Sequence, residues 1–236
     1  MATWVTHLII ADRILERYPQ LDRRGFCVGN IAPDCNVENE DWSGFTPPRE
    51  VTHWMRGSRK ALSDCDAFCK AFILRPGEKQ PEEYAFLLGY YSHLLTDAAF
   101  QAMIRDPERV RAVWRRIRAD SALSRKAVGM EESWDSVKQL YPKKAWTQGI
   151  RNMEAEYLQG HPDCGYLTQI LPLEAFPDYI DYLPKGCIVR KIRVMGNTPV
   201  PSPDADFIPL SRQEYAAFLE QSERLIVERF CHFYLL

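Results

Sequence analysis

Apolar residues recur at helical spacing over most of the chain. Leu8, Ala11 and Ile14 share one face of a helix that Pro19 would end. Similar periodicity returns in later segments, which are separated by stretches rich in glycine and proline. The pattern predicts helices at about 5–18, 49–55, 58–72, 81–104, 107–119, 130–140 and 143–158.

The segment 81–104 carries the clearest of these patterns. Pro81 suits the first turn of a helix, and Glu82 and Glu83 interact favourably with the positive end of the helix dipole. The run that follows, AFLLGYYSHLLTDAAFQAMI, is apolar on nearly every turn. We therefore expect a long and largely buried helix.

Residues 160–210 differ from the rest of the chain. They are rich in proline and hold two β-like runs, YLTQIL and CIVRKIRVM, so we expect a long irregular insert with a small hairpin. After it, Ser211 and Glu214 form a capping box, which begins a final helix over 211–234. Together these patterns predict an all-α fold in a single domain, 1–236, with two smaller domains as the alternative.

The composition is that of an ordinary globular protein. Of 236 residues, 46% are hydrophobic and 26% are charged, which argues against a disordered chain. The net charge of -2 gives no overall attraction to nucleic acid or to an anionic membrane. Near the N-terminus, Asp12, Arg13 and Glu16 soon interrupt the apolar stretch, and no later run approaches ~20 apolar residues. We therefore expect a cytoplasmic protein with neither a secretory signal nor a transmembrane segment.

Seven cysteines are scattered along the chain, and their odd number argues against a disulfide framework. Cys65 and Cys69 lie one helical turn apart and suggest half of a metal site, but no second close pair completes it. Buried free thiols are the favoured interpretation.

A histidine and a carboxylate lie four residues apart in the segment 81–104. His93 and Asp97 therefore project from the same face of the helix, which suits two ligands of one metal ion or a ligand shared by two ions. A local hydrogen bond between the two side chains is the alternative. Gly89, one turn earlier, leaves room for a close approach. A buried His–Asp pair also needs polar partners, and a divalent cation would be one.

Two further candidate ligands come from separate segments, as is usual for metal sites between helices. Asp34 follows Pro33 in FCVGNIAPDCN, residues 26–36, which we predict to be rich in turns. His53 stands in VTHWM. The structural alternatives are a turn or cap residue for Asp34 and a half-buried member of an aromatic cluster for His53.

Four motifs occur in the order found in one family of proteins. THLIIA, FCVGNIAPD, THW and FLLGYYSHLLTD each contain a potential metal ligand. In this order they resemble the zinc-dependent phospholipase C family, whose fold and site are shared by fungal single-strand nucleases. The resemblance spans about residues 5–100. It implies an all-α bundle of that type around a cluster of zinc ions.

The resemblance also implies which residues bind metal. One ion would be held by Asp34, His53, His93 and Asp97. A second would be held by His7, Asp97 and the N-terminal backbone, so that Asp97 would bridge the two ions. Histidine and carboxylate ligands suit zinc, with Mn or Fe as alternatives. Without the resemblance, His7 is better interpreted as a helix residue whose ring is satisfied by the backbone.

Two departures from the family pattern limit the number of ions. In the family, a mature N-terminal tryptophan supplies its amine and carbonyl after a signal peptide is removed, whereas this chain has Trp4 and no signal. The family's third ion is held by two further histidines and a glutamate that follow the helical pair. Here no histidine follows Asp97 until His161, in the turn-like segment GHPDCG. We therefore expect one or two zinc ions.

The resemblance implies a zinc-dependent hydrolase of phosphodiester bonds, with a small phosphoester or a phospholipid head group as substrate. Asp34 would be catalytic, positioning or deprotonating the attacking water as its family counterpart is proposed to do. Fold and ligands indicate the reaction class without choosing the substrate, and nothing indicates nucleic acid or an oligomeric state. Two alternatives stay open: an inactive metal-binding relative that serves as a scaffold or binding protein, and a metal-free helical protein.

Overall fold

The computed structural model describes residues 2–41, 43–57, 63–141 and 143–231. Helices dominate it, and in these ranges the strands β1 (Val37–Glu38) and β2 (Phe45–Thr46) form one short antiparallel hairpin. The prediction of an all-α fold is therefore confirmed. None of the helices in the described ranges is both long enough and apolar enough to cross a bilayer.

Eight longer helices are described along the chain. They are α1 (Trp4–Arg17), α2 (Arg23–Gly29), α5 (Pro81–Ile104), α6 (Pro107–Ala119), α8 (Trp134–Leu140), α9 (Lys143–Gly160), α10 (Cys187–Met195) and α11 (Arg212–Cys231). Short helical pieces join them: η1 (Ala32–Asp34), α3 (Arg49–Thr52), α4 (Cys65–Phe68), η3 (Cys69–Ile73), α7 (Ser121–Lys126) and η4 (Tyr166–Ile170).

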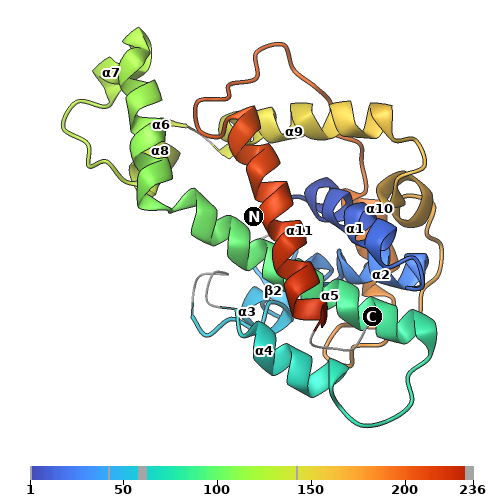
Figure 1. The fold of residues 1–236 in the computed structure, drawn as a ribbon. Coiled ribbons are helices and arrows are strands. Elements are labelled where there is room, and N and C mark those ends of the chain that lie inside the picture. The colour runs from blue at the N-terminus through green and yellow to red at the C-terminus, as the bar shows by residue number, and fades with distance from the viewer. Residues whose placement is uncertain (1, 42, 58–62, 142, 232–236) are drawn as a thin grey trace.

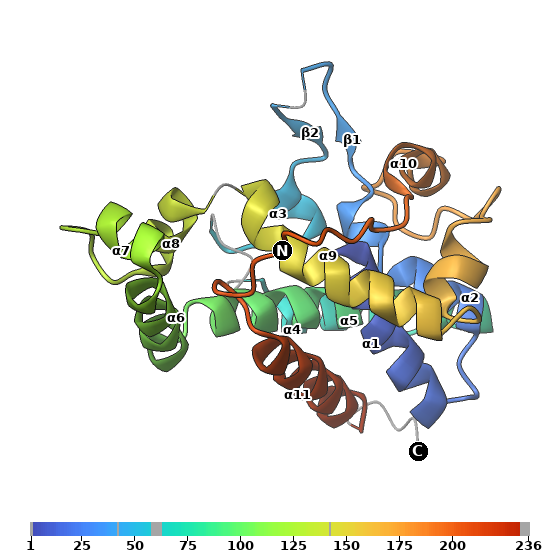
Figure 2. The same cartoon turned by 90° about the horizontal axis from the view of Figure 1, so that it is seen from above.

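The helix α5 runs through the middle of the molecule, and α1, α2, α4 and α11 pack around it (Figures 1 and 2). Its bounds agree with the predicted 81–104, and Pro81 lies in its first turn as expected. Residues 85–97 are buried without interruption. A helix that is covered on all faces carries few polar side chains, so His93 and Asp97 stand out within it.

The backbones of α2 and α5 approach each other too closely for side chains to lie between them. A β-carbon on Gly89 would lie 2.2 Å from the carbonyl oxygen of Phe26, and one on Gly29 would lie 2.1 Å from that of Phe86. Both distances are shorter than any ordinary van der Waals contact, so only glycine fits at these positions. This contact sets α2 directly against the turn of α5 that precedes His93.

The prediction of a turn-rich segment at 26–36 is wrong for its first four residues, which belong to α2. The carboxylate of Asp22 caps this helix and accepts the amide hydrogen of Gly25 at 2.7 Å. Gly29 suggests a turn by its composition, yet its lack of a side chain serves the contact with α5 instead. The remainder of the segment does turn, through η1, which ends on Asp34.

The first and last helices lie side by side, α1 against α11 (Figure 1). The capping box predicted for α11 is present: the Glu214 carboxylate accepts from Ser211 N at 2.7 Å, and Ser211 Oγ accepts from Glu214 N at 3.1 Å. The described part of α11 ends at Cys231, and the last predicted residues, 232–234, lie outside the described ranges.

The hairpin expected within residues 160–210 is absent from this fully described segment. YLTQIL lies mainly in the π-helix η4, and CIVRKIRVM forms α10. Ile188 and Ile192, one helical turn apart on α10, are each 4% exposed, so burial on one helical face outweighs the β-propensity of these residues. The rest of the segment is irregular, as predicted.

The remaining predictions hold in part. The segment 49–55 is helical only over α3, and 58–72 is helical from residue 65 through α4 and η3, with 58–62 outside the described ranges. Residues 107–119 form α6 as predicted, and α7 was not anticipated. All seven cysteines are free thiols, and Cys69 is buried.

Candidate metal centre

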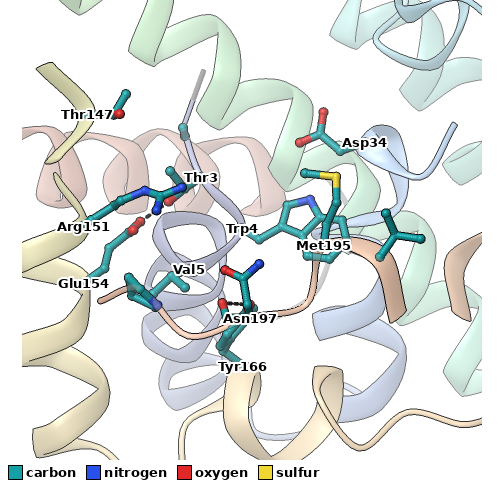
Figure 3. Close-up of a pocket in the computed structure, with 13 residues that line it drawn as sticks. Thr3, Trp4, Val5, Asp34, Thr147, Arg151, Glu154, Tyr166, Met195 and Asn197 are labelled. Carbon is teal, nitrogen blue, oxygen red and sulfur yellow. Dashed lines mark hydrogen bonds between the residues drawn. The ribbon is translucent and has the colours of Figure 1, made fainter. Parts of the chain in front are cut away.

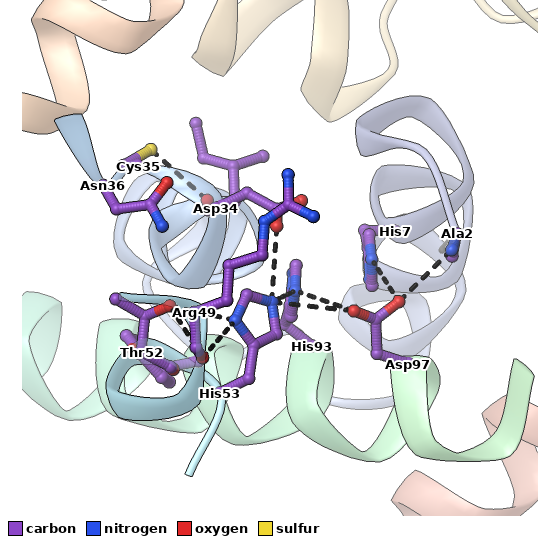
Figure 4. Close-up of polar contacts among 12 residues, drawn as sticks. Ala2, His7, Asp34, Cys35, Asn36, Arg49, Thr52, His53, His93 and Asp97 are labelled. Atoms are coloured by element: carbon purple, nitrogen blue, oxygen red, sulfur yellow. Dashed lines mark hydrogen bonds and ion pairs between the residues drawn. The ribbon is translucent and has the colours of Figure 1, made fainter. Parts of the chain in front are cut away.

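Side chains from separate elements meet beside α5 (Figure 4). The elements are α1, η1, α5 and the residue that follows α3, and they contribute His7, Asp34, His93 with Asp97, and His53. The three histidines and Asp97 are fully buried, whereas the side chain of Asp34 is 13% exposed. The fold therefore gathers every residue that the sequence proposes as a metal ligand.

The Asp97 carboxylate lies between the histidine rings. Its Oδ1 is 3.7 Å from His7 Nε2, and its Oδ2 is 3.6 Å from the Nε2 atoms of both His53 and His93. Asp34 Oδ1 lies 3.3 Å from His53 Nε2. The ligand atoms form two overlapping groups, each within 4.8 Å: His7, His93 and Asp97, and Asp34, His53 and His93.

These spacings suit a shared cation. Four ligands at ~2.0–2.1 Å from a tetrahedral zinc ion lie ~3.3 Å from one another. The separations of 3.3–3.7 Å lie near that value and are longer than the usual 2.7–3.2 Å of an N–H···O hydrogen bond. The two carboxylates and the imidazoles are also the ligand types that zinc prefers.

Backbone carbonyls orient two of the rings. His93 Nδ1 lies 2.7 Å from the carbonyl oxygen of Asn30, and His53 Nδ1 lies 3.2 Å from that of Arg49. His53 Nδ1 also lies 2.9 Å from Thr52 Oγ1. The Nε2 atoms of both rings face the centre, where they are 3.4 Å apart. A histidine that binds a metal through one ring nitrogen commonly contacts a backbone or side-chain partner through the other, so this arrangement fits a metal ion.

His7 completes the second group from the side of α1. Its ring stacks on that of His93, with centroids 3.8 Å apart. Burial, followed by the nearby His93, lowers the pKa of His7 to about 4, so the ring is neutral at pH 7. Among the described residues, neither of its ring nitrogens has a hydrogen-bond partner. A neutral, buried imidazole whose Nε2 faces a carboxylate at 3.7 Å suits a metal ligand.

The N-terminal backbone also reaches the centre. The nitrogen of Ala2 donates to Asp97 Oδ1 at 3.2 Å, and Ala2 is 2% exposed. This bond orients the carboxylate of the first ligand group, whose other oxygen faces His53 and His93. The N-terminal segment is thus placed beside His7 and Asp97, where the resemblance implies a backbone contribution to the second ion.

Within the described residues, the histidine, cysteine and acidic groups that are close enough to share a metal ion all draw on these five ligands. His161 does not join them. Its ring stacks on Tyr157, and its Nδ1 lies 2.8 Å from the Tyr157 carbonyl oxygen. His161 therefore takes no part in the candidate centre.

A pocket of about 320 Å³ opens beside the centre, and Asp34 lies in its wall (Figure 3). Its other walls come from the N-terminal end of α1, from α9 and from the end of α10. Trp4, Arg151 and Glu154 line it. In the sequence, Trp4 is notable only against the N-terminal tryptophan of the family, and no pattern singles out Arg151 or Glu154. The spacing of Arg151 and Glu154 places both on one face of α9. The sequence of α9 alone does not predict that this face borders the pocket beside the candidate metal centre.

The fold and the buried cluster thus define an all-α protein with a candidate zinc centre. A model of the family described as zinc dependent phospholipase C matches residues 6–100. This match supports membership of that family, and the matched segment contains every candidate ligand. No curated protein and no solved structure matches the chain.

Proposed function

We propose that this protein is a metal-dependent hydrolase of phosphodiester bonds that binds one or two zinc ions. The observation that carries the proposal is the convergence of three buried imidazoles and two carboxylates, with the Nε2 atoms of His53 and His93 facing each other at 3.4 Å. The family match supports the reaction class, and the pocket beside Asp34 offers room for a small substrate.

The proposed ligand sets follow the two sides of the Asp97 carboxylate. Asp34, His53, His93 and Asp97 would hold one ion, and His7 with Asp97 and the backbone near Ala2 would contribute to a second. A divalent ion bound here would polarise a phosphoryl oxygen and lower the pKa of water toward ~7. Mn or Fe would fit the same ligand types.

Among the five proposed ligands, Asp34 is the one that also lines the pocket. Its side chain is partly exposed, whereas the side chain of Asp97 is fully enclosed. A carboxylate at the boundary between centre and pocket is placed to accept a proton from a water molecule that approaches a bound phosphoester. We therefore assign Asp34 the role of positioning and deprotonating the attacking water.

The substrate that this arrangement favours is a small phosphoester or a phospholipid head group. The pocket volume of about 320 Å³ matches a small molecule. The net charge of -2 gives no overall attraction to a nucleic acid.

The first test is the metal content of protein purified without chelators or an affinity tag, measured by elemental mass spectrometry. We expect one to two equivalents of zinc, lost in His93→Ala. Hydrolysis of bis(4-nitrophenyl) phosphate at the measured metal content then tests activity. A metal-free wild type would contradict the proposal, because the proposed hydrolysis depends on a bound metal ion.

Asp34→Asn separates catalysis from metal binding. We expect a fall in turnover of ~10²–10⁴-fold, typical for the loss of a general base, while at least one metal equivalent remains. Asp41→Asn, which changes an exposed carboxylate between β1 and β2, is the matched control and should retain full activity.

A second candidate function is a metal-containing scaffold. The observation that favours it is that four of the five ligands are fully buried, so that a bound ion would tie α1, α3 and α5 together. A wild type with its full zinc content and no turnover of several phosphodiesters would select this function over the hydrolase.

A further inference from the structure

The pocket beside Asp34 presents hydrogen-bond donors that lack partners. The first is the indole N–H of Trp4. Trp4 is 7% exposed, it lines the pocket, and among the described residues its Nε1 has no hydrogen-bond partner. An indole nitrogen can only donate, and a buried donor without an acceptor is unfavourable. A ligand in the pocket that offers an acceptor oxygen would satisfy it.

The second donor is the guanidinium of Arg151, on the face of α9 that borders the pocket (Figure 3). The residue is exposed, and no described carboxylate lies within ion-pair distance of it. Arginine remains charged at any physiological pH and presents a planar fork that matches phosphate and carboxylate groups. Arg151 therefore brings a positive charge without an ion-pair partner among the described residues to the wall of the pocket, and this charge acts on the Glu154 carboxyl, where it partly offsets the rise in pKa that burial causes.

The acid closest to Arg151 along this face is Glu154, and it is engaged elsewhere. Its Oε1 accepts the Thr6 amide at 3.0 Å and the Thr6 hydroxyl at 2.6 Å, and it also accepts the Thr3 hydroxyl. Burial raises the pKa of the Glu154 carboxyl, which favours its neutral form. Glu154 thus secures the start of α1 and is a poor counter-ion for Arg151.

The two ends of the pocket differ in chemistry. Asp34 and the candidate metal centre lie at one end, Arg151 lies at the other, and the Trp4 ring lies between them (Figure 3). Met195 closes the same stretch with apolar surface. A molecule that fills the pocket from the metal centre therefore crosses Trp4 and ends against a guanidinium.

We propose that Arg151 and the Trp4 indole bind a second anionic group of the substrate, a carboxylate or a phosphate, so that the pocket selects phosphoesters with a further negative charge. This assignment of substrate class rests on the proposed phosphodiester hydrolysis at the metal centre. Its test uses binding as well as turnover, so that the two proposals fail separately.

The experiment is calorimetric titration of the protein as purified with three probes that share a three-carbon frame. Propylphosphonate carries one anionic end, 3-phosphonopropionate adds a carboxylate, and propane-1,3-bisphosphonate adds a second phosphonate. We expect the wild type to bind at least one of the two doubly anionic probes about tenfold more tightly than propylphosphonate, as one charge-assisted interaction would give. The stronger of the two identifies the preferred anion.

Variants test which residues cause the preference for doubly anionic probes. Arg151→Gln should reduce the binding ratio to about one, Arg151→Lys should keep part of it, and Trp4→Phe should lower it a few-fold by removing the N–H while keeping a ring. Arg193→Gln is the matched control, because Arg193 is exposed on α10 next to the pocket residue Val194 but does not line the pocket. Its ratio should equal that of the wild type. Unfolding midpoints confirm that the variants are folded.

Equal affinities for the three probes in the wild type would overturn the proposal, and so would the failure of all three to bind. A preference that survives in Arg151→Gln would also overturn it. Turnover of bis(4-nitrophenyl) phosphate, measured in parallel, addresses the other proposal: a preserved preference without any hydrolysis would reject the hydrolase and leave the anion site standing.

Discussion

Two buried polar clusters meet the N-terminal part of α1, and they are built differently. One consists of Thr3, Thr6, Glu154 and Tyr215, and we name it the Glu154 cluster. The other is the candidate metal centre. In the Glu154 cluster, the carboxylate accepts two hydroxyls and an amide, and the Tyr215 hydroxyl lies 2.9 Å from that of Thr6. Donors and acceptors there are matched without any added group.

The candidate metal centre is arranged differently. Its ring nitrogens and carboxylate oxygens lie 3.3–3.7 Å apart, and the Nε2 atoms of His53 and His93 lie 3.4 Å apart. Burial of so many polar groups is costly unless they are satisfied, and a shared cation would satisfy several of them at once. The comparison teaches that burial and polarity alone do not identify a site. The spacing of the polar atoms separates a hydrogen-bonded cluster from a candidate cation site.

Of the changes considered, removal of metal should have the largest effect on stability, and it should act through the candidate metal centre alone. A ligand present at a hundredfold excess over its Kd stabilises the folded state by ~2.7 kcal/mol, which corresponds to roughly 5–11 °C in Tm for a chain of this size. We expect a chelator to lower the Tm of the wild type by about this amount. Asp97→Asn should abolish the effect of the chelator, whereas Glu154→Gln should preserve it. A Tm of the wild type that is unchanged by chelator would remove the distinction between the two clusters.

Gly89→Ala should disturb the metal centre and leave the Glu154 cluster intact. The new β-carbon would meet the Phe26 carbonyl oxygen at 2.2 Å and push α2 away, which displaces the Asn30 carbonyl that orients His93. We expect a loss of about 1–3 kcal/mol in unfolding free energy, measured with urea, together with weaker zinc binding. Gly160→Ala is the control, since a β-carbon there meets nothing within 4 Å. Equal stability of the two variants would contradict the close α2–α5 contact.

Glu154→Gln tests the Glu154 cluster through pH. The folded pKa of Glu154 lies above the ordinary value of 4.5, so the folded state binds more protons than the unfolded state just above that pH. Unfolding free energy from this group therefore decreases as pH rises from 4.5 through the raised pKa. Glutamine keeps the acceptor oxygen but cannot ionise. The unfolding free energy of Glu154→Gln should therefore increase relative to that of the wild type as pH rises. Parallel stability–pH curves for the two proteins would show that Glu154 does not titrate as described.

The smallest effect is expected at a third polar contact, which fastens α10 to β1. Lys191, 1% exposed, donates to Glu38 Oε2 at 2.8 Å, and Arg190 donates to Oε1 at 2.7 Å. Lys191→Met should cost roughly 1 kcal/mol, because Arg190 still pairs with the carboxylate. These two cations lower the pKa of Glu38 to about 2, so its stabilising contribution is present above pH 4.5 and is lost as pH falls toward 2. Urea titrations at pH 7 and pH 3 should show a smaller difference between the proteins at the lower pH.

Much of the fold and most of the candidate site follow from local sequence. The bounds of α5 follow from Pro81, two acidic residues and an uninterrupted apolar period, all of which act within a few residues. His93 and Asp97 share a face because of helix geometry alone. Asp34 and His53 were proposed from residue type and motif order, and the structure places both beside His93.

Other features depend on contacts that no local pattern encodes. The α2 helix forms where composition indicates turns, because Gly29 and Gly89 let it pack on α5. Likewise, α10 is helical because Ile188 and Ile192 are buried on one face, which outweighs the β-propensity of the segment.

The sequence by itself determined which ligand types are present, which of them share a helix face and where the long helices begin and end. Only the tertiary structure decided that α9 faces the start of α1, and so brings Arg151, Trp4 and Asp34 around one pocket. The physical reason is the distance along the chain over which each interaction acts. Helix periodicity and capping act over a few residues, whereas Trp4 and Arg151 meet only after the side chains of distant helices have packed together.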